Sequence, residues 1–299
     1  GETVDLGAED GPALYEGSLA AAVERFHAIL YAGHSYGAEP AQRDFDRLQP
    51  THVREFHQRF FVPGNTVLAV AGDIDTDRMA GRLESLFSGW VAREVPERTV
   101  QPPVASKKRA QHNFTADKLQ TWLVFGHDLP QVPLADQASL EVMNYILAGG
   151  HLWTRMTVET RYKYGYTNDA SGFLEPHWDG PGSYTFRSYS RHDVIDDIYR
   201  NMMDEVSRIL DEPVSDEELF VAKGALTDGN FPVAYDDGYA IARSFAMEKL
   251  RYGHHDRSGS YVSRVRAVDA DDVRAAARKY LRPEDMQIVL MGQPVDLLP

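Results

Sequence analysis

The feature that most constrains this chain is a weak internal repeat at an offset of 220 residues. Each copy places apolar side chains at i, i+3, i+7 and i+8, which make one face of a helix. A proline then ends the helix, and a buried strand followed by glycine is predicted at residues 66–71 and again at 287–291. Few of the aligned residues are identical, so chance recurrence of a helix–proline–strand unit is the alternative to duplication. The aligned pairs are Val53 and Val273, Arg54 and Arg274, Phe56 and Ala276, Arg59 and Lys279, Phe60 and Tyr280, Phe61 and Leu281, Pro63 and Pro283, Asn65 and Asp285, and Gly72 and Gly292.

The two copies are unequal in length. Residues 93–113 carry three prolines and the basic run Lys107-Lys108-Arg109, a composition typical of an exposed linker. We therefore predict that residues 1–95 form the C-terminal half of a first domain, that 96–113 are a linker, and that 114–299 form a complete second domain. Roughly a hundred residues that would begin the first domain are missing from this sequence. Half a domain should expose its core face and a sheet edge unless another polypeptide covers them.

Hydrophobic periodicity gives the fold class. In the second copy it predicts strands at residues 119–125, 166–173 and 183–189, and helices at 135–147, 151–162 and 195–210. Ser215 and Glu218 have the spacing of a capping box that starts a further helix. We expect an α+β protein made of duplicated two-layer domains, each a sheet with packed helices, of which the first copy is incomplete.

Composition excludes several classes of function. Lys and Arg number 31 against 45 Asp and Glu, and a net charge of −14 disfavours nucleic acid as a partner. The absence of cysteine excludes disulfides, thiol catalysis and Cys-ligated zinc. The longest apolar runs, residues 67–71 and 288–291, are far below the ~18 residues of a membrane span. No signal peptide is recognisable at Gly1, so any targeting segment is absent or already removed; the bacterial cytoplasm and the periplasm both fit the sequence.

The eleven histidines do not form a recognisable metal motif. His52 and His57 are five residues apart, which places them about 140° apart around a helix, whereas a zinc pair is usually four apart. The loop triplet His254-His255-Asp256 would need remote ligands. No His-x-x-Glu-His, His-Glu-x-x-His, Gly-x-Ser-x-Gly, Walker or Gly-x-Gly-x-x-Gly motif occurs. No catalytic residue and no metal ligand is therefore assigned in this chain.

A more specific pattern runs from Gly149-Gly150 to Met156, and then from Arg161 through Gly165 to Asn168. It predicts a glycine hinge, a helix that ends at Gly165, and an arginine near that junction; the alternative is a surface arginine that caps its own helix. Together with His34-Ser35-Tyr36-Gly37 and residues 61–65, these motifs resemble, in the same order, the insulinase/pitrilysin-type zinc metallopeptidases, including their processing-peptidase branch.

The resemblance implies that zinc is bound by a His-x-x-Glu-His segment outside this chain, in the missing N-terminal segment or in a homologous subunit. It implies a portion or subunit of a zinc-dependent endopeptidase that encloses extended peptides or unfolded proteins, inactive by itself; the alternative is a catalytically inactive subunit that acts as the scaffold of a heterodimer. In the family a paired Arg and Tyr, seven residues apart, reach the substrate backbone. Arg161 matches the Arg, Asn168 stands at the Tyr position, and Tyr166 is the nearest substitute. The expected substrate-binding residues are Gly149, Gly150, Arg161, Tyr166 and Asn168. A third hypothesis is an unrelated α+β binding protein whose repeat is fortuitous.

Overall fold

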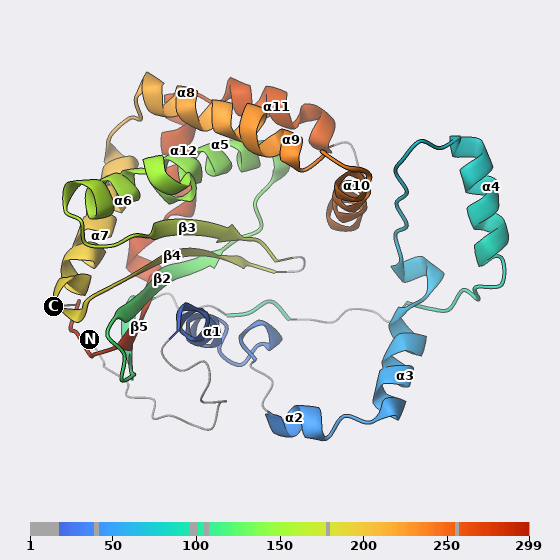
Figure 1. The fold of residues 1–299 in the computed structure, drawn as a ribbon, viewed down its shortest axis with the longest axis horizontal. Helices are drawn as coiled ribbons and strands as arrows, with labels where there is room; N and C mark the ends of the chain where they lie inside the picture. The colour runs from blue at the N-terminus through green and yellow to red at the C-terminus, as the bar shows by residue number, and fades with distance from the viewer. Residues whose placement is uncertain are drawn as a thin grey trace. The chain divides into compact units, whose positions relative to one another are not determined.

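The computed structural model describes residues 18–38, 42–95, 101–104, 108–177, 180–254 and 257–298 (Figure 1). The chain divides into two compact units, one formed by residues 1–42, 101–224 and 265–299 and the other by 43–100 and 225–264. The predicted division at residues 95 and 113, which follows the repeat rather than these units, stays a prediction. None of the helices in the described ranges has the length and apolarity needed to cross a bilayer.

The first unit is built on a mixed five-stranded sheet of order β1-β5-β2-β4-β3. β1 (Ala110–Thr115) runs parallel to β5 (Gln287–Gly292), and β5 is antiparallel to β2 (Thr121–Leu129). β4 (Gly182–Ser190) joins β2 to the edge strand β3 (Ala170–Glu175) in antiparallel pairing. The α+β class and the strand predicted at 287–291 are confirmed. β1 begins at residue 110, inside the segment predicted as a linker, and residues 110–113 pair with β5; residues 96–100 and 105–107 lie outside the described residues.

Helices of the first unit cover one face of this sheet. α5 (Leu134–Asn144) and α7 (Ile195–Asp211) both contact α12 (Ala270–Tyr280), and α7 also contacts β2 and β4. α7 follows the short turn η6 (His192–Val194). Of the apolar stripe that the sequence predicts it buries Ile195, Ile198, Tyr199, Met202, Val206 and Ile209, and the last member, Leu210, is half-buried. α8 (Asp216–Gly224) begins at the predicted capping box: the Glu218 amide donates to Ser215 Oγ at 3.2 Å, and the Ser215 amide donates to Glu218 Oε2 at 2.7 Å.

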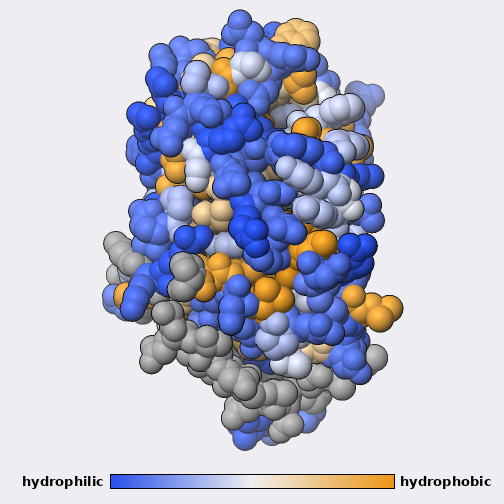
Figure 2. All heavy atoms as spheres, turned by 90° about the vertical axis from the view of Figure 1, so that its left-hand side faces the viewer, coloured by the Kyte–Doolittle hydropathy of each residue, from blue (hydrophilic) through white to orange (hydrophobic). Residues whose placement is uncertain are grey.

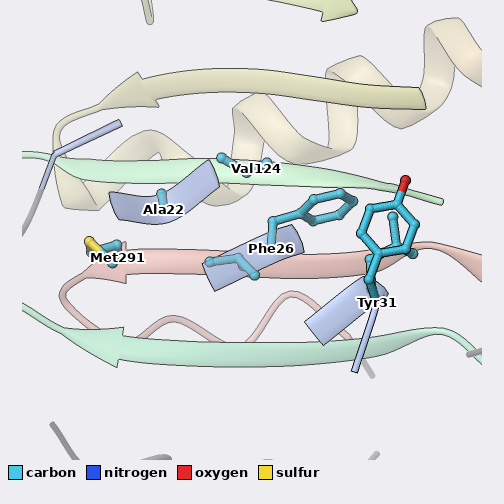
Figure 3. Close-up of a cluster of buried hydrophobic side chains, with 7 residues drawn as sticks. Ala22, Phe26, Tyr31, Val124 and Met291 are labelled. Atoms are coloured by element: carbon cyan, nitrogen blue, oxygen red, sulfur yellow. The ribbon is translucent and has the colours of Figure 1, made fainter. Parts of the chain in front are cut away.

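The opposite face of the sheet is covered by α1 (Leu19–Leu30), which lies far from the strands in sequence (Figure 1). Ala22, Phe26, Leu30 and Tyr31 are fully buried there against Val124 of β2 and Val289 and Met291 of β5. Figure 3 shows Ala22, Phe26 and Tyr31 on the side of α1 that meets β2 and β5. The turn η1 (Ser35–Gly37) follows α1 in the same unit.

The second unit consists of helices and extended segments. It contains α3 (Pro50–Phe60), η2 (Pro63–Asn65), α4 (Thr76–Phe87), η7 (Ala225–Asn230), α9 (Phe231–Val233), α10 (Gly238–Tyr252) and most of α2 (Gln42–Asp46) and α11 (Arg257–Ala267). η2 occupies the place that η8 (Pro283–Asp285) takes in the repeat. The strand predicted at residues 66–71 is wrong: a strand needs a hydrogen-bonded neighbour, and among the described residues none pairs with this segment.

Candidate functional site

Arg161 lies in a tight turn between a helix and the sheet edge. The π-helix η5 (Val158–Lys163) ends where the Gly165 amide donates to the Arg161 carbonyl at 2.9 Å, and Gly165 takes a φ of 65°, a conformation that favours glycine. The half-buried Arg161 side chain reaches forward, and its Nη1 donates to the main-chain carbonyl of Asn168 at 3.1 Å. The structure therefore brings Arg161 and Asn168 together, through the main chain of Asn168.

Tyr166 is held by other contacts. Its ring stacks on Tyr164 at 5.2 Å between centroids, and its carbonyl accepts from Ser190 Oγ. The strand predicted at 166–173 begins later than expected, at Ala170, because Thr167 closes a turn by bonding Asp169. Tyr166 and Asn168 therefore both precede β3 and do not share a strand.

Gly149 and Gly150 lie where the helix pattern predicted at 135–147 gives way to a π-helix, η3 (Tyr145–Gly149). A Cβ on Gly149 would lie 2.4 Å from the Asn144 side-chain nitrogen, and one on Gly150 would lie 2.7 Å from the Tyr145 carbonyl oxygen. A side chain at either position would clash with these atoms, so close packing explains why both residues are glycine. The next residue, His151, has a φ of 56°, a strained value for a residue with a side chain.

The helix predicted at 151–162 is broken into three pieces: η4 (His151–Trp153), α6 (Arg155–Thr157) and η5. π-helical turns are frequent at functional sites, and here η3 contains Gly149 and η5 contains Arg161. The exposed rings of Trp153 and Tyr162 stack at 6.0 Å, and Arg161 lies 5.6 Å over the Tyr162 ring. On the side of the molecule where α6 and α7 lie, the surface is mostly hydrophilic, with hydrophobic residues gathered near its middle (Figure 2).

An ion pair that the sequence did not indicate anchors this region. Arg155 Nε donates to Glu218 Oε1 at 2.6 Å, and its Nη2 donates to Glu218 Oε2 at 3.1 Å, which ties α6 to α8. Burial raises the pKa of Glu218, but the hydrogen bonds from Arg155 and Ser215 outweigh burial and hold this pKa below its usual value. Because the partners are 63 residues apart, their pairing depends on the tertiary fold, and no local pattern signals it.

No group of three or more His, Asp or Glu side chains able to hold a metal occurs in the part of the chain that the structure describes. His52 accepts a hydrogen bond from the Gln49 amide at the start of α3, and His57 stacks on the Phe61 ring. His255 and Asp256 lie outside the described residues. His52 and His57 therefore engage a main-chain amide and an aromatic ring, respectively.

A set of apolar side chains in the second unit is exposed where its repeat counterparts are buried. Val53 and Phe56 of α3 are 61% and 57% exposed, whereas their counterparts in α12, Val273 and Ala276, are 0% and 5% exposed. We call the exposed set the open core face; its members are Val53, Phe56, Phe61, Leu68 and Val70. Each of these exposed apolar side chains has a buried apolar counterpart in the second copy. Such a patch indicates a surface that contacts another polypeptide.

Comparisons with known proteins give a consistent result. The family model described as "Peptidase M16 inactive domain" matches residues 47–226. An uncharacterized zinc protease of Streptomyces coelicolor is 22% identical over 241 residues, which cover 78% of this chain and 51% of that protein. A probable mitochondrial-processing peptidase subunit beta of Arabidopsis thaliana is 22% identical over 273 residues, covering 82% of this chain and 47% of that protein.

Solved structures agree on the fold. The chain matches the crystal structure of a peptidase M16 inactive domain from Pseudomonas fluorescens with a TM-score of 0.81 and 20% identity, over 93% of this chain and 66% of that one. It matches a protease from Helicobacter pylori with a TM-score of 0.80 and 15% identity, over 93% of this chain and 67% of that one. The chain spans about half the length of the two curated relatives named above.

Proposed function

Because the chain belongs to the M16 peptidase family and contains its inactive domain, we propose that it is the C-terminal portion of a zinc-dependent endopeptidase that encloses and positions extended peptides. The zinc site lies outside this chain in the proposal, in a preceding segment or in a homologous subunit, and no step through zinc is assigned to the residues described. The observation that supports the proposal most directly is the open core face, because its exposed apolar side chains would be stabilised by a further polypeptide packed against the second unit.

Two features of the first unit support a role in holding substrate. Within the described ranges the Arg161 side chain donates a hydrogen bond through Nη1, and its Nε and Nη2 donors have the geometry with which a guanidinium binds peptide carbonyls. β3 is the last strand of the described sheet and pairs with β4, so its outer edge offers main-chain groups to an extended peptide.

The proposal is tested by reconstitution. The purified chain is assayed on an unfolded protein with zinc, alone and mixed with a family polypeptide that carries a zinc motif. We expect no proteolysis by the chain alone and chelator-sensitive proteolysis in the mixture beyond that of the zinc polypeptide by itself. Zinc-dependent proteolysis by the chain alone would overturn the proposal.

The second candidate function is a non-catalytic subunit that acts as a scaffold. One observation favours it: Asn168 stands at the position where the family resemblance places a tyrosine, and Arg161 engages only its main-chain carbonyl. The scaffold function predicts that Arg161 contributes to neither substrate binding nor turnover.

The Arg161→Ala variant separates the two functions. If Arg161 holds substrate, the variant loses a charged hydrogen bond and kcat/KM of the assembled enzyme falls about 10- to 100-fold. Lys163→Ala is the matched control, since Lys163 is an exposed cation two residues away that pairs with Glu159. Equal kcat/KM for Arg161→Ala and the unmodified chain, with assembly intact, supports the scaffold.

A further inference from the structure

We propose that Arg155 is a positioning residue, which fixes the orientation of Arg161 through the stretch of helix that joins them. The inference rests on the proposed function, which gives Arg161 the task of holding an extended peptide, and it names a second residue on which that task depends. The Arg155 side chain is only 10% exposed, so it acts from within the fold and not by touching a peptide.

Arg155 and Arg161 lie on one continuous stretch of helix. α6 begins at Arg155, and Val158, where α6 passes into η5, keeps right-handed helical angles of φ −59° and ψ −48°. The six residues from Arg155 to Arg161 therefore cover roughly 9 Å at the usual helical rise. A rotation of the first turn about the helix axis is passed on to the last turn, where Arg161 lies.

A two-pronged ion pair ties the first turn to α8. Arg155 Nε and Nη2 bind the two carboxylate oxygens of Glu218 at 2.6 and 3.1 Å, and Glu218 also accepts from the Ser215 amide at the start of α8. Two parallel hydrogen bonds to one carboxylate fix the plane of a guanidinium as well as its distance. Because the capping box holds Glu218 in place, the pair fixes the rotation of α6 relative to α8.

A second tie joins the same turn to the sheet edge. Thr157 Oγ1 donates to the His151 carbonyl at 2.7 Å and lies 3.3 Å from the carbonyl oxygen of Ala170, the first residue of β3. The strained backbone of His151, with its φ of 56°, is thereby held from α6, and strain of this kind persists only where the surroundings enforce it. Two elements, α8 and β3, thus orient α6, and loss of the Arg155 pair leaves one of these two ties.

The helical segment and the far end of the Arg161 side chain offer weaker support. α6 has three residues and η5 six, and the hydrogen-bond pattern changes from α to π between them. The bond from Arg161 Nη1 to the Asn168 carbonyl lies at an exposed site, where water competes for both groups. The direction of Arg161 therefore depends on how α6 is held, and so on Arg155.

Arg155→Lys tests this dependence and keeps a cation beside Glu218. Lysine carries a point charge that cannot form two parallel bonds, so α6 loses its fixed rotation. In the assembled enzyme we expect kcat/KM to fall about tenfold, mainly through a higher KM, whereas the same change made on Arg161→Ala should cause no further fall. Arg282→Lys is the matched control, since Arg282 and Asp128 form another partly buried pair, which joins β2 to the start of η8.

The kinetic outcomes separate positioning from a structural role. An equal fall of kcat/KM in both backgrounds would mean that Arg155 supports folding or assembly, which overturns the inference and leaves the proposed function standing. The inference is also overturned if Arg161→Ala lowers kcat/KM and Arg155→Lys does not. A fall with Arg282→Lys as large as that with Arg155→Lys would show that any such pair matters, with the same consequence.

Hydrogen exchange of the Gly165 amide gives a readout that needs no catalysis, because this amide closes η5 on the Arg161 carbonyl. We expect its exchange to be at least about tenfold faster in Arg155→Lys and unchanged in Arg282→Lys. If Arg161→Ala left kcat/KM unchanged, the peptide-holding part of the proposed function would fail. Faster exchange at Gly165 in Arg155→Lys would then still support the inference, and unchanged exchange would overturn it.

Discussion

Replacing Phe26 by alanine should destabilise the first unit by about 3–5 kcal/mol, the range for removing a buried aromatic side chain from a core. The Phe26 ring is fully buried where α1 meets β2 and β5 (Figure 3). Residues 43–100, which belong to the second unit, separate α1 from the strands of the first unit along the chain. The attachment of α1 to the sheet therefore depends on side-chain contacts such as those of Phe26. Loss of the ring should also release α1 and expose the sheet face formed by Val124 and Val289.

Urea unfolding and limited proteolysis measure the two effects. Glu24→Ala is the matched control, because Glu24 lies on the exposed side of the same helix and its removal should change the free energy of unfolding by less than about 0.5 kcal/mol. The Phe26→Ala chain should be cleaved within residues 18–38 faster than the control. A change below 1 kcal/mol with unchanged cleavage would mean that α1 does not stabilise the sheet.

The sequence predicted those parts of the fold whose signal is local. The stripe of α7 and the capping box at Ser215 were found because the residues that form them are close in sequence. The strand at residues 66–71 was predicted by the same apolar pattern as β5, yet only β5 forms. The apolar pattern indicates that a segment can form a strand, but the strand forms only where a neighbouring strand pairs with it. β5 has two such neighbours, whereas residues 66–71 have none among the described residues.

The candidate site was predicted to a similar extent. The spacing predicts a helix that ends at Gly165 with Arg161 near that junction, and in the structure Arg161 lies in η5, whose end is closed by the Gly165 amide. The Arg155–Glu218 ion pair and the placement of α1 on the sheet could not be predicted, because each joins residues brought together only by folding. The substrate-binding role of Gly149, Gly150, Arg161, Tyr166 and Asn168 stays a prediction.

Acidification should destabilise the first unit mainly through His127. This fully buried side chain on β2 accepts a hydrogen bond from the Arg282 amide at Nε2, at 3.2 Å, and its Nδ1 lies 2.8 Å from the Asp128 carbonyl. Since the amide is a donor, the neutral ring carries its proton on Nδ1. Burial lowers the pKa of His127 to about 4, and the nearby Arg282 guanidinium acts in the same direction.

The sign follows from proton linkage. Between pH 6.5 and pH 4 the unfolded chain protonates at residue 127 while the folded chain does not, so the free energy of unfolding falls as the pH falls. The loss is about 3 kcal/mol across that window and should be absent above about pH 7. Glu175, whose pKa is about 2 because hydrogen bonds from His27 and Arg187 outweigh the effect of its burial, contributes a further loss only below about pH 4.5.

Urea unfolding of the chain at a series of pH values between 7 and 4.5 isolates the contribution of His127 from that of Glu175. His127→Gln should be less stable at pH 7, because burial of a different polar group disturbs the hydrogen bonds to Arg282 and Asp128, but its stability should vary less with pH. His177→Gln is the control, since burial also lowers the pKa of His177, at a site that is only partly enclosed. The His177 ring lies 5.4 Å from the Tyr31 ring and 4.0 Å from the Tyr36 ring between centroids. If His127→Gln kept the full pH slope and His177→Gln lost it, the acid sensitivity would belong to this aromatic contact rather than to His127.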